Sequence, residues 1–204
     1  MNRNRLMTIL LVPVAAASLA GCGVNAIPTA EENVKARWAD VQSDYQRRAN
    51  LVPNLVATVK GAAASEQAIL TGVTEARAKA TSINITTDDL SNPDRMRQFA
   101  QSQNQFTQAL GQLRTVVERY PDLKSQVNFQ TLMSQLEGNE NRINIAVRDY
   151  NQAVQDYNTR IRTFPDVIGA KVFYGSKPKV PFEATTPNAE VAPTVDFGAG
   201  NTAH

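Results

Sequence analysis

Three polar residues stand where the helical pattern of this sequence otherwise places apolar side chains. Glu66, Gln103 and Glu140 each interrupt one of three long apolar seams. Carboxylates and amides gathered inside a helical bundle can bind a metal ion or a small polar ligand. Di-iron bundles, however, combine Glu with Glu-x-x-His, and the one histidine, His204, is the last residue. The three residues therefore form a candidate polar layer that lacks the usual metal ligands.

The loop lengths bring these three residues to the same height, within about one helical turn, if the helices run antiparallel. Three interpretations of the layer remain open. It can fix the register of the helices, its polar groups satisfying one another or meeting Arg142. The two acids can instead lie at the edge of the seam and reach solvent. The layer can also bind a ligand or a metal ion.

The remaining chemistry in the sequence is sparse. Arg48, a further charge in the first seam, can extend to solvent, pair with an acid on another helix, or contact the chain near Pro121. The sequence has no Gly-rich phosphate loop, no Cys/His metal spacing and no histidine placed to act as a base. Helical seams that bury their side chains also supply no cleft. We therefore predict neither enzymatic activity nor a cofactor.

The N-terminus has the layout of a bacterial lipoprotein signal. Arg3 and Arg5 precede an apolar stretch at 6–17, which is too short to span a membrane as a mature helix. The sequence Leu-Ala-Gly-Cys follows and ends at Cys22, the only cysteine. This ending looks like a lipobox, in which the thiol of Cys22 takes a diacylglycerol and becomes the new N-terminus. We predict a signal peptide at 1–21 and lipidation at Cys22.

Lipidation would place the domain at a bacterial membrane, facing the periplasm or the cell exterior. Several acyl chains on one residue hold a protein stably to a bilayer. Gly23 follows the cysteine in place of an inner-membrane retention Asp, which leaves the outer membrane open as the destination. Loss of Arg3 and Arg5 with the signal lowers the basic residues from 21 to 19, equal to the 19 acidic ones. A neutral chain without a basic block does not favour nucleic acid as a partner.

Apolar residues at spacings of three and four predict long bundle helices. A capping box at Thr29 and Glu32 predicts that a first helix begins there and continues to about residue 80, kinked or split at Pro53. Asn92-Pro93 predicts the start of a second helix that ends before Pro121. A third helix is predicted from between 125 and 128 to Phe164-Pro165, with one more short turn around 166–172.

The predicted fold class is all-α. We expect an elongated, antiparallel up-and-down bundle of three long helices, effectively four because the first is kinked or split at Pro53. The sequence divides into a signal peptide at 1–21, a lipid-anchored linker at 22–28, a helical bundle at 29–174, and a flexible tail at 175–204 rich in Pro, Thr and Ala.

The same register predicts an exposed surface on the first helix. It places Pro53 beside Arg119, where the second helix ends, so the segment before Pro53 has no neighbour from that helix. Trp38, Val41 and Tyr45 form the apolar face of this segment. This segment must pack on the chain after Phe164, on a partner protein or on a second copy of the chain. Of these three we expect a partner protein or a second copy.

Several separated stretches resemble the LemA family of bacterial proteins, over residues 30–182. They are RRANLVPNLVATVKG at 47–61, YPDLK at 120–124 and NRINIAVRDYNQAVQDYNTRIRTFP at 141–165. The resemblance implies an α-helical bundle attached to a membrane at its N-terminus, with no established enzymatic activity. Many members resemble a transmembrane-anchored arrangement, from which the lipobox departs. Positions that recur in the family, without assigned roles, are Arg48, Pro53, Asn54, Glu66, Arg142, Tyr150 and Asn151.

Together these features predict a membrane-anchored lipoprotein that is a non-catalytic structural or protein-interaction module of the bacterial cell envelope. Its partners would be the membrane and either an envelope protein or a second copy of the chain. The alternative is a bundle that binds a small ligand or metal ion through Glu66, Gln103 and Glu140.

Overall fold

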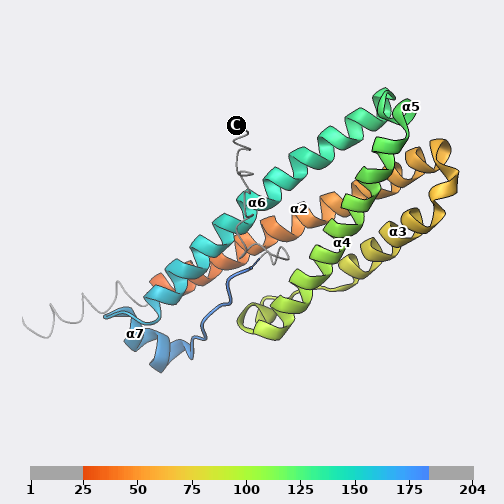
Figure 1. Ribbon diagram of the computed structural model, residues 1–204. Helices are drawn as coiled ribbons and strands as arrows, with labels where there is room; N and C mark the ends of the chain where they lie inside the picture. Colours follow the sequence, from red (N-terminus) through yellow and green to blue (C-terminus); the bar gives the residue numbers. More distant parts are fainter. Residues whose placement is uncertain (1–24, 184–204) are drawn as a thin grey trace, which may run out of the picture.

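The computed structural model describes residues 25–183 and is an antiparallel bundle of four long helices (Figure 1). The long helices are α2 (Ala26–Ala62), α3 (Gln67–Ser82), α4 (Pro93–Arg119) and α6 (Val127–Arg160). Short elements join or follow them: η1 (Ala64–Glu66), η2 (Asp88–Ser91), α5 (Pro121–Lys124), α7 (Asp166–Gly169) and the π-helical turn η3 (Ala170–Tyr174). Residues 25–183 contain no strand, which confirms the all-α fold class.

Several predictions concern residues outside this range. The signal peptide, Cys22 and Gly23 precede the described residues, and 184–204 follow them. Within residues 25–183, no helix is long and apolar enough to cross a membrane.

The first predicted helix is a helical hairpin. The chain leaves the helical conformation at Ala63 (φ −134°, ψ 55°), passes through η1 and returns as α3. Helix α2 packs against α6, and α3 packs against both α2 and α4 (Figure 1). Of the two predictions for Pro53, the split is wrong, because α2 continues through Pro53 and the split lies at Ala63. The four helical segments are present as predicted. The apolar spacing continues through the turn because α2 and α3 both face the same core.

The helix starts differ in how well the sequence marks them. Helix α4 begins as predicted, because the Asn92 side chain accepts hydrogen bonds from Asp94 N (3.0 Å) and Arg95 N (3.3 Å). The capping box of the first helix does not form. Helix α2 begins at Ala26, and Thr29 Oγ1 donates to Asn25 O at 2.8 Å from within the first turn.

Pro53 lies on the exposed side of α2, and the helix continues through it. A proline has no amide hydrogen, so Ala49 O, four residues earlier, loses its usual helical donor. Helix α3 supplies the replacement, since Arg77 Nε donates to Ala49 O at 2.7 Å. Ala49 is only 2% exposed, so water is a poor substitute for this donor. The proline thus creates an acceptor on α2 that attaches the returning helix.

The apolar face of Trp38, Val41 and Tyr45 is buried, contrary to its prediction as a surface for a partner or a second copy. These residues are 2%, 0% and 9% exposed. The chain after Phe164, the other predicted neighbour, helps to cover the face, since the ring of Phe182 lies 6.0 Å from Trp38 and 6.1 Å from Tyr45. The ring of Trp38 lies 5.1 Å from Tyr150 and 5.5 Å from Phe99, measured between centroids. The face is covered because the hairpin at Ala63 reverses the chain before residue 80, and the start of α4 then lies beside the first half of α2.

The predicted tail at 175–204 is wrong over its first part. Residues 177–183, here termed the strap, run back from η3 along the bundle in extended conformation (blue in Figure 1). Two asparagine side chains of α6 each form a pair of hydrogen bonds with its backbone. Asn158 donates to Lys179 O and accepts from Lys179 N, both at 2.8 Å. Asn151 donates to Phe182 O (2.9 Å) and accepts from Phe182 N (2.7 Å). The Val180 amide of the strap donates to Leu90 O at 2.8 Å.

The strap completes the core at this end of the bundle. Phe182 is 3% exposed, and its ring lies 5.9 Å from Phe99 and 6.0 Å from Trp38. Lys179, also buried, pairs with Glu31 at 2.8 Å. The bundle domain therefore extends at least to residue 183, because these side chains and backbone groups belong to its packing.

The role of Pro53 can be tested with a double-mutant cycle. We expect Arg77→Ala to lower the free energy of unfolding by about 2 kcal/mol, because a buried carbonyl loses its charged donor. In a Pro53→Ala background residue 53 has an amide that can bond Ala49 O, so the same change should cost about 1 kcal/mol less. Urea denaturation measures both values.

The matched control is Lys79→Ala, an exposed position on the same helix. Its effect should be small and independent of Pro53→Ala. Additive effects of Pro53→Ala and Arg77→Ala would contradict the proposed compensation.

Candidate interaction groove and the buried arginine beside it

Arg48 on α2 is 1% exposed and joins three helices of the bundle. Its Nη1 donates to Glu140 Oε1 on α6 (3.1 Å) and to Thr107 Oγ1 on α4 (3.0 Å). Its Nη2 donates to Gln103 Oε1 on α4 at 2.8 Å. Of the three roles predicted for Arg48, the structure shows the ion pair with an acid on another helix.

The layer of Arg48, Gln103 and Glu140 separates two hydrophobic cores. One core contains Tyr45 and lies toward α7; the other begins at Ala49 and lies toward α5. The guanidinium also stacks on aromatic rings from both sides, 4.9 Å from the centroid of Tyr45 and 5.0 Å from that of Phe106. Burial raises the pKa of the Tyr45 hydroxyl to about 12, so the ring stays neutral beside the cation at ordinary pH.

Glu66 does not belong to this layer, contrary to the prediction. It lies at the far end of the bundle, where Tyr120 Oη donates to Glu66 Oε1 (3.3 Å) and Arg119 Nη1 pairs with it (3.2 Å). The cause is again the turn at Ala63, which places Glu66 at the tip of the hairpin. Pro53 is likewise not level with Arg119. The three-residue set required by the ligand-binding alternative is therefore not assembled.

Two polar residues of the layer were not predicted. Thr107 accepts from Arg48, and the Asn139 side chain donates to Asp44 O on α2 at 3.0 Å. Asn139 is 2% exposed, and its position next to Glu140 is the signal that could have found it. Among the described residues, Arg48 Nε and Asn139 Oδ1 are buried without a hydrogen-bond partner. The layer is therefore not fully satisfied, which is costly for a purely stabilising feature.

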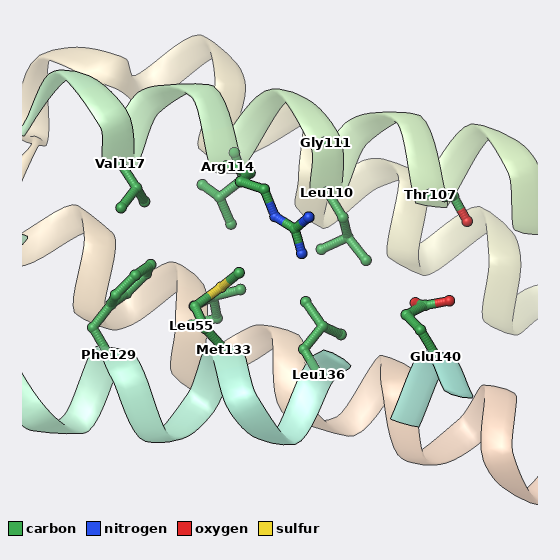
Figure 2. A pocket seen from close by; sticks show the side chains of 11 residues that line it. Leu55, Thr107, Leu110, Gly111, Arg114, Val117, Phe129, Met133, Leu136 and Glu140 are labelled. Carbon is green, nitrogen blue, oxygen red and sulfur yellow. The ribbon is translucent and has the colours of Figure 1, made fainter. Parts of the chain in front are cut away.

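An apolar groove begins at this layer and runs toward α5, between α4 and α6 (Figure 2). It has a volume of about 230 Å³, with Leu55 of α2 at its floor. Leu110, Leu113 and Val117 line the α4 wall, and Phe129, Met133 and Leu136 line the α6 wall. At the other end of the molecule the strap fills the corresponding space between α4 and α6. The groove thus lies in the part of this seam that the strap, as far as residue 183, does not reach.

Polar and charged residues border this apolar floor. Thr107 and Glu140 close one end, and Figure 2 shows the side chain of Arg114 lying over the gap. Arg114 Nη2 lies 3.5 Å from Glu137 Oε1 on the opposite wall, with both side chains more than half exposed. Such an exposed pair contributes little to stability and can open at small cost.

Metal chemistry has no visible basis in the described part of the chain. Residues 25–183 contain no group of three or more His, Cys, Asp or Glu side chains close enough to hold a metal ion. The polar groups of the layer already bind one another through Arg48. What remains available is the apolar surface of the groove, so the arrangement is suited to binding by burial of apolar area.

We expect the Arg48 layer to specify how the helices align and to contribute little net stability to the bundle. We expect Glu140→Leu to cost about 3 kcal/mol in free energy of unfolding, because it leaves the buried guanidinium without its carboxylate. Combining it with Arg48→Met should recover most of this loss and bring the variant within about 1 kcal/mol of the parent. Urea denaturation checks both.

Glu137→Leu is the control, an acid one turn away on the exposed rim, and should change stability by less than about 0.5 kcal/mol. A double variant as unstable as Glu140→Leu alone would show that the layer itself carries the stability of the bundle.

Comparison with known proteins agrees with the fold. The model of the LemA family matches residues 37–197, which cover most of the 204-residue chain and all of the layer and groove described above. No curated protein matches the chain. On the extent of the family match, this chain belongs to the LemA family.

Proposed function

We propose that this protein is a membrane-anchored, non-catalytic module of the bacterial cell envelope that binds a helix of a partner protein in the groove between α4 and α6. The groove is the observation that carries the proposal. It is apolar and open, while the polar groups able to do chemistry nearby are engaged with Arg48.

The membrane part of the proposal rests on the sequence. Leu-Ala-Gly-Cys at 19–22 supports acylation of Cys22, and Asn25, the first described residue, follows three positions later. A chain of three residues spans at most about 10 Å. A bundle attached this closely would be held at the bilayer surface, with its groove available to other envelope proteins.

The walls of the groove favour a helix as the occupant. Both walls are α-helices whose backbone groups are bonded within the helices, so they offer no free edge for an extended peptide. An occupant must therefore satisfy its own backbone, as a helix does. From Thr107 to Val117 the groove is about 15 Å long, which accommodates about three helical turns.

The mixed charges of the rim indicate the character of that helix. Its buried face would be apolar at positions i, i+3 or i+4, and i+7. Its edges would carry both an acid to meet Arg114 and a base to meet Glu137. Binding would replace the exposed Arg114–Glu137 pair with pairs to the partner.

A steric block in living cells tests this proposal. A photoreactive amino acid at Met133, on the groove wall, should form a discrete adduct with a partner when the full anchored chain is expressed in its host. Gly111→Trp should reduce the adduct at least fivefold by filling the groove. A Cβ added at Gly111 has no atom within 4 Å, so the new side chain can leave the helix backbone in place.

Gly72→Trp is the matched control. Gly72 is also helical and also has no atom within 4 Å of an added Cβ, but it lies outside the groove. Gly72→Trp should leave the amount of adduct unchanged. The partner peptide cross-linked at Met133 should have the apolar spacing of an amphipathic helix. An adduct with a second copy, with residues 184–204 of the same chain, or one unchanged by Gly111→Trp would overturn the proposal.

A further inference from the structure

The helical segment at 166–174, formed by α7 and η3, is packed with its large apolar side chains outward. Its buried residues are the small ones, Gly169 and Ala170. Ile168, Val172 and Phe173 are 54%, 69% and 68% exposed. An amphipathic helix of a soluble domain normally does the opposite. This segment therefore turns its small residues toward the bundle and its large apolar side chains toward solvent.

The segment is fixed in this orientation by close packing. Gly169 lies against Ile27 at the start of α2, since a Cβ added at the glycine would stand 3.4 Å from Ile27 Cδ1. Arg160 of α6 pairs with Asp166 at 3.7 Å. The outward side chains thus form a surface that the packing beneath them holds in place. Phe164 (80% exposed) and Tyr174 (43% exposed) extend this surface.

The charges on this segment and immediately beside it in the sequence are mostly positive. Arg162, Lys171 and Lys177 are exposed, and none of them has an ion pair within the described residues. Between Arg160 and Lys177 the chain has four basic residues and one acid, Asp166. An apolar patch flanked by unpaired cations is complementary to a bilayer that contains anionic lipids.

The location of the surface points to the same occupant. The segment contacts the start of α2 at one end of the elongated bundle (Figure 1). Asn25 immediately precedes α2, and Cys22 is within about 10 Å of it along the chain. The bilayer that holds an acylated Cys22 would therefore lie next to the exposed apolar side chains.

We propose that the segment 164–174 is a membrane-docking surface, in which Phe164, Ile168, Val172 and Phe173 insert into the lipid interface while Arg162, Lys171 and Lys177 contact anionic headgroups. The proposal deepens the proposed function, on which it rests for the nearby anchor. Docking would fix the orientation of the bundle relative to the membrane, since the lipid tether alone would leave it free to rotate.

Vesicle binding by an acyl-free chain tests the surface. The chain from residue 22 to residue 204 with Cys22→Ser is mixed with vesicles of phosphatidylglycerol and phosphatidylethanolamine, and with neutral phosphatidylcholine vesicles. We expect binding to the anionic vesicles that weakens with salt. Val172→Ser with Phe173→Ser should reduce the partition coefficient at least tenfold, and Lys171→Gln with Lys177→Gln should reduce it on anionic vesicles alone.

The control removes equally exposed apolar side chains elsewhere. Val127 (75% exposed) begins α6 at the opposite end, and Ile145 (50%) lies in mid-helix. Val127→Ser with Ile145→Ser should change binding by less than twofold. A second readout uses Phe173→Trp, whose fluorescence should be quenched by brominated lipids, and Val127→Trp, whose fluorescence should not.

Each contrary result overturns the proposal. The proposal is wrong if the chain does not bind vesicles at millimolar anionic lipid. It is also wrong if Val127→Ser with Ile145→Ser lowers the partition coefficient as much as Val172→Ser with Phe173→Ser. A dimer that Val172→Ser with Phe173→Ser dissociates, seen by sedimentation, would show instead that the surface pairs with a second copy. Because the tested chain has no acyl group and an open groove, its result is independent of lipidation at Cys22 and of the cross-linking result at Gly111.

Discussion

The guanidinium of Arg48 is a charge enclosed between two hydrophobic cores, and the arrangement of the four helices depends on how it is satisfied. It reaches Gln103 and Thr107 on α4 and Glu140 on α6. These two helices make little direct contact with each other, whereas α2 packs closely on α6 and α3 on α4. A buried charge tolerates few alternative registers, because any shift that removes a partner leaves it unpaired. The arginine on α2 therefore sets the distance between α4 and α6.

That distance has two consequences along the seam. On the α7 side of the layer the gap is filled by the strap, whose backbone is held by Asn151 and Asn158 and whose Phe182 completes the aromatic core. On the α5 side the same gap stays open as the groove. The polar groups thus maintain the spacing, and the spacing leaves an apolar surface open between α4 and α6. At the α7 end, a second apolar surface faces outward beside the start of α2.

The sequence predicted the class of fold, the bounds of α4 and, to within about one helical turn, the common height of Gln103 and Glu140. The reason is that the loop at 120–126 is short and restricts the antiparallel register. The prediction from sequence was wrong at Ala63, where the chain reverses between α2 and α3. The apolar spacing continues unchanged from one helix to the other, so spacing alone does not reveal the reversal. Both the misplacement of Glu66 and the expected exposure of Trp38 follow from that single error. The strap was missed because extended chain bonded through its backbone has no helical period; the seven-residue spacing of Asn151 and Asn158 was the available signal.

The most direct test of this account measures the gap itself. Spin labels at Gln112→Cys and Ser134→Cys, both exposed, span the groove, and labels at Asn50→Cys and Ser134→Cys span the α2–α6 contact; Cys22, the only native cysteine, is replaced by serine. Pulsed electron paramagnetic resonance gives each distance distribution in the parent and in Arg48→Met with Glu140→Leu. We expect the distribution across the groove to broaden and shift in the double variant, while the α2–α6 distribution is unchanged. An equally narrow, unshifted distribution across the groove would contradict the claim that Arg48 sets the spacing of α4 and α6.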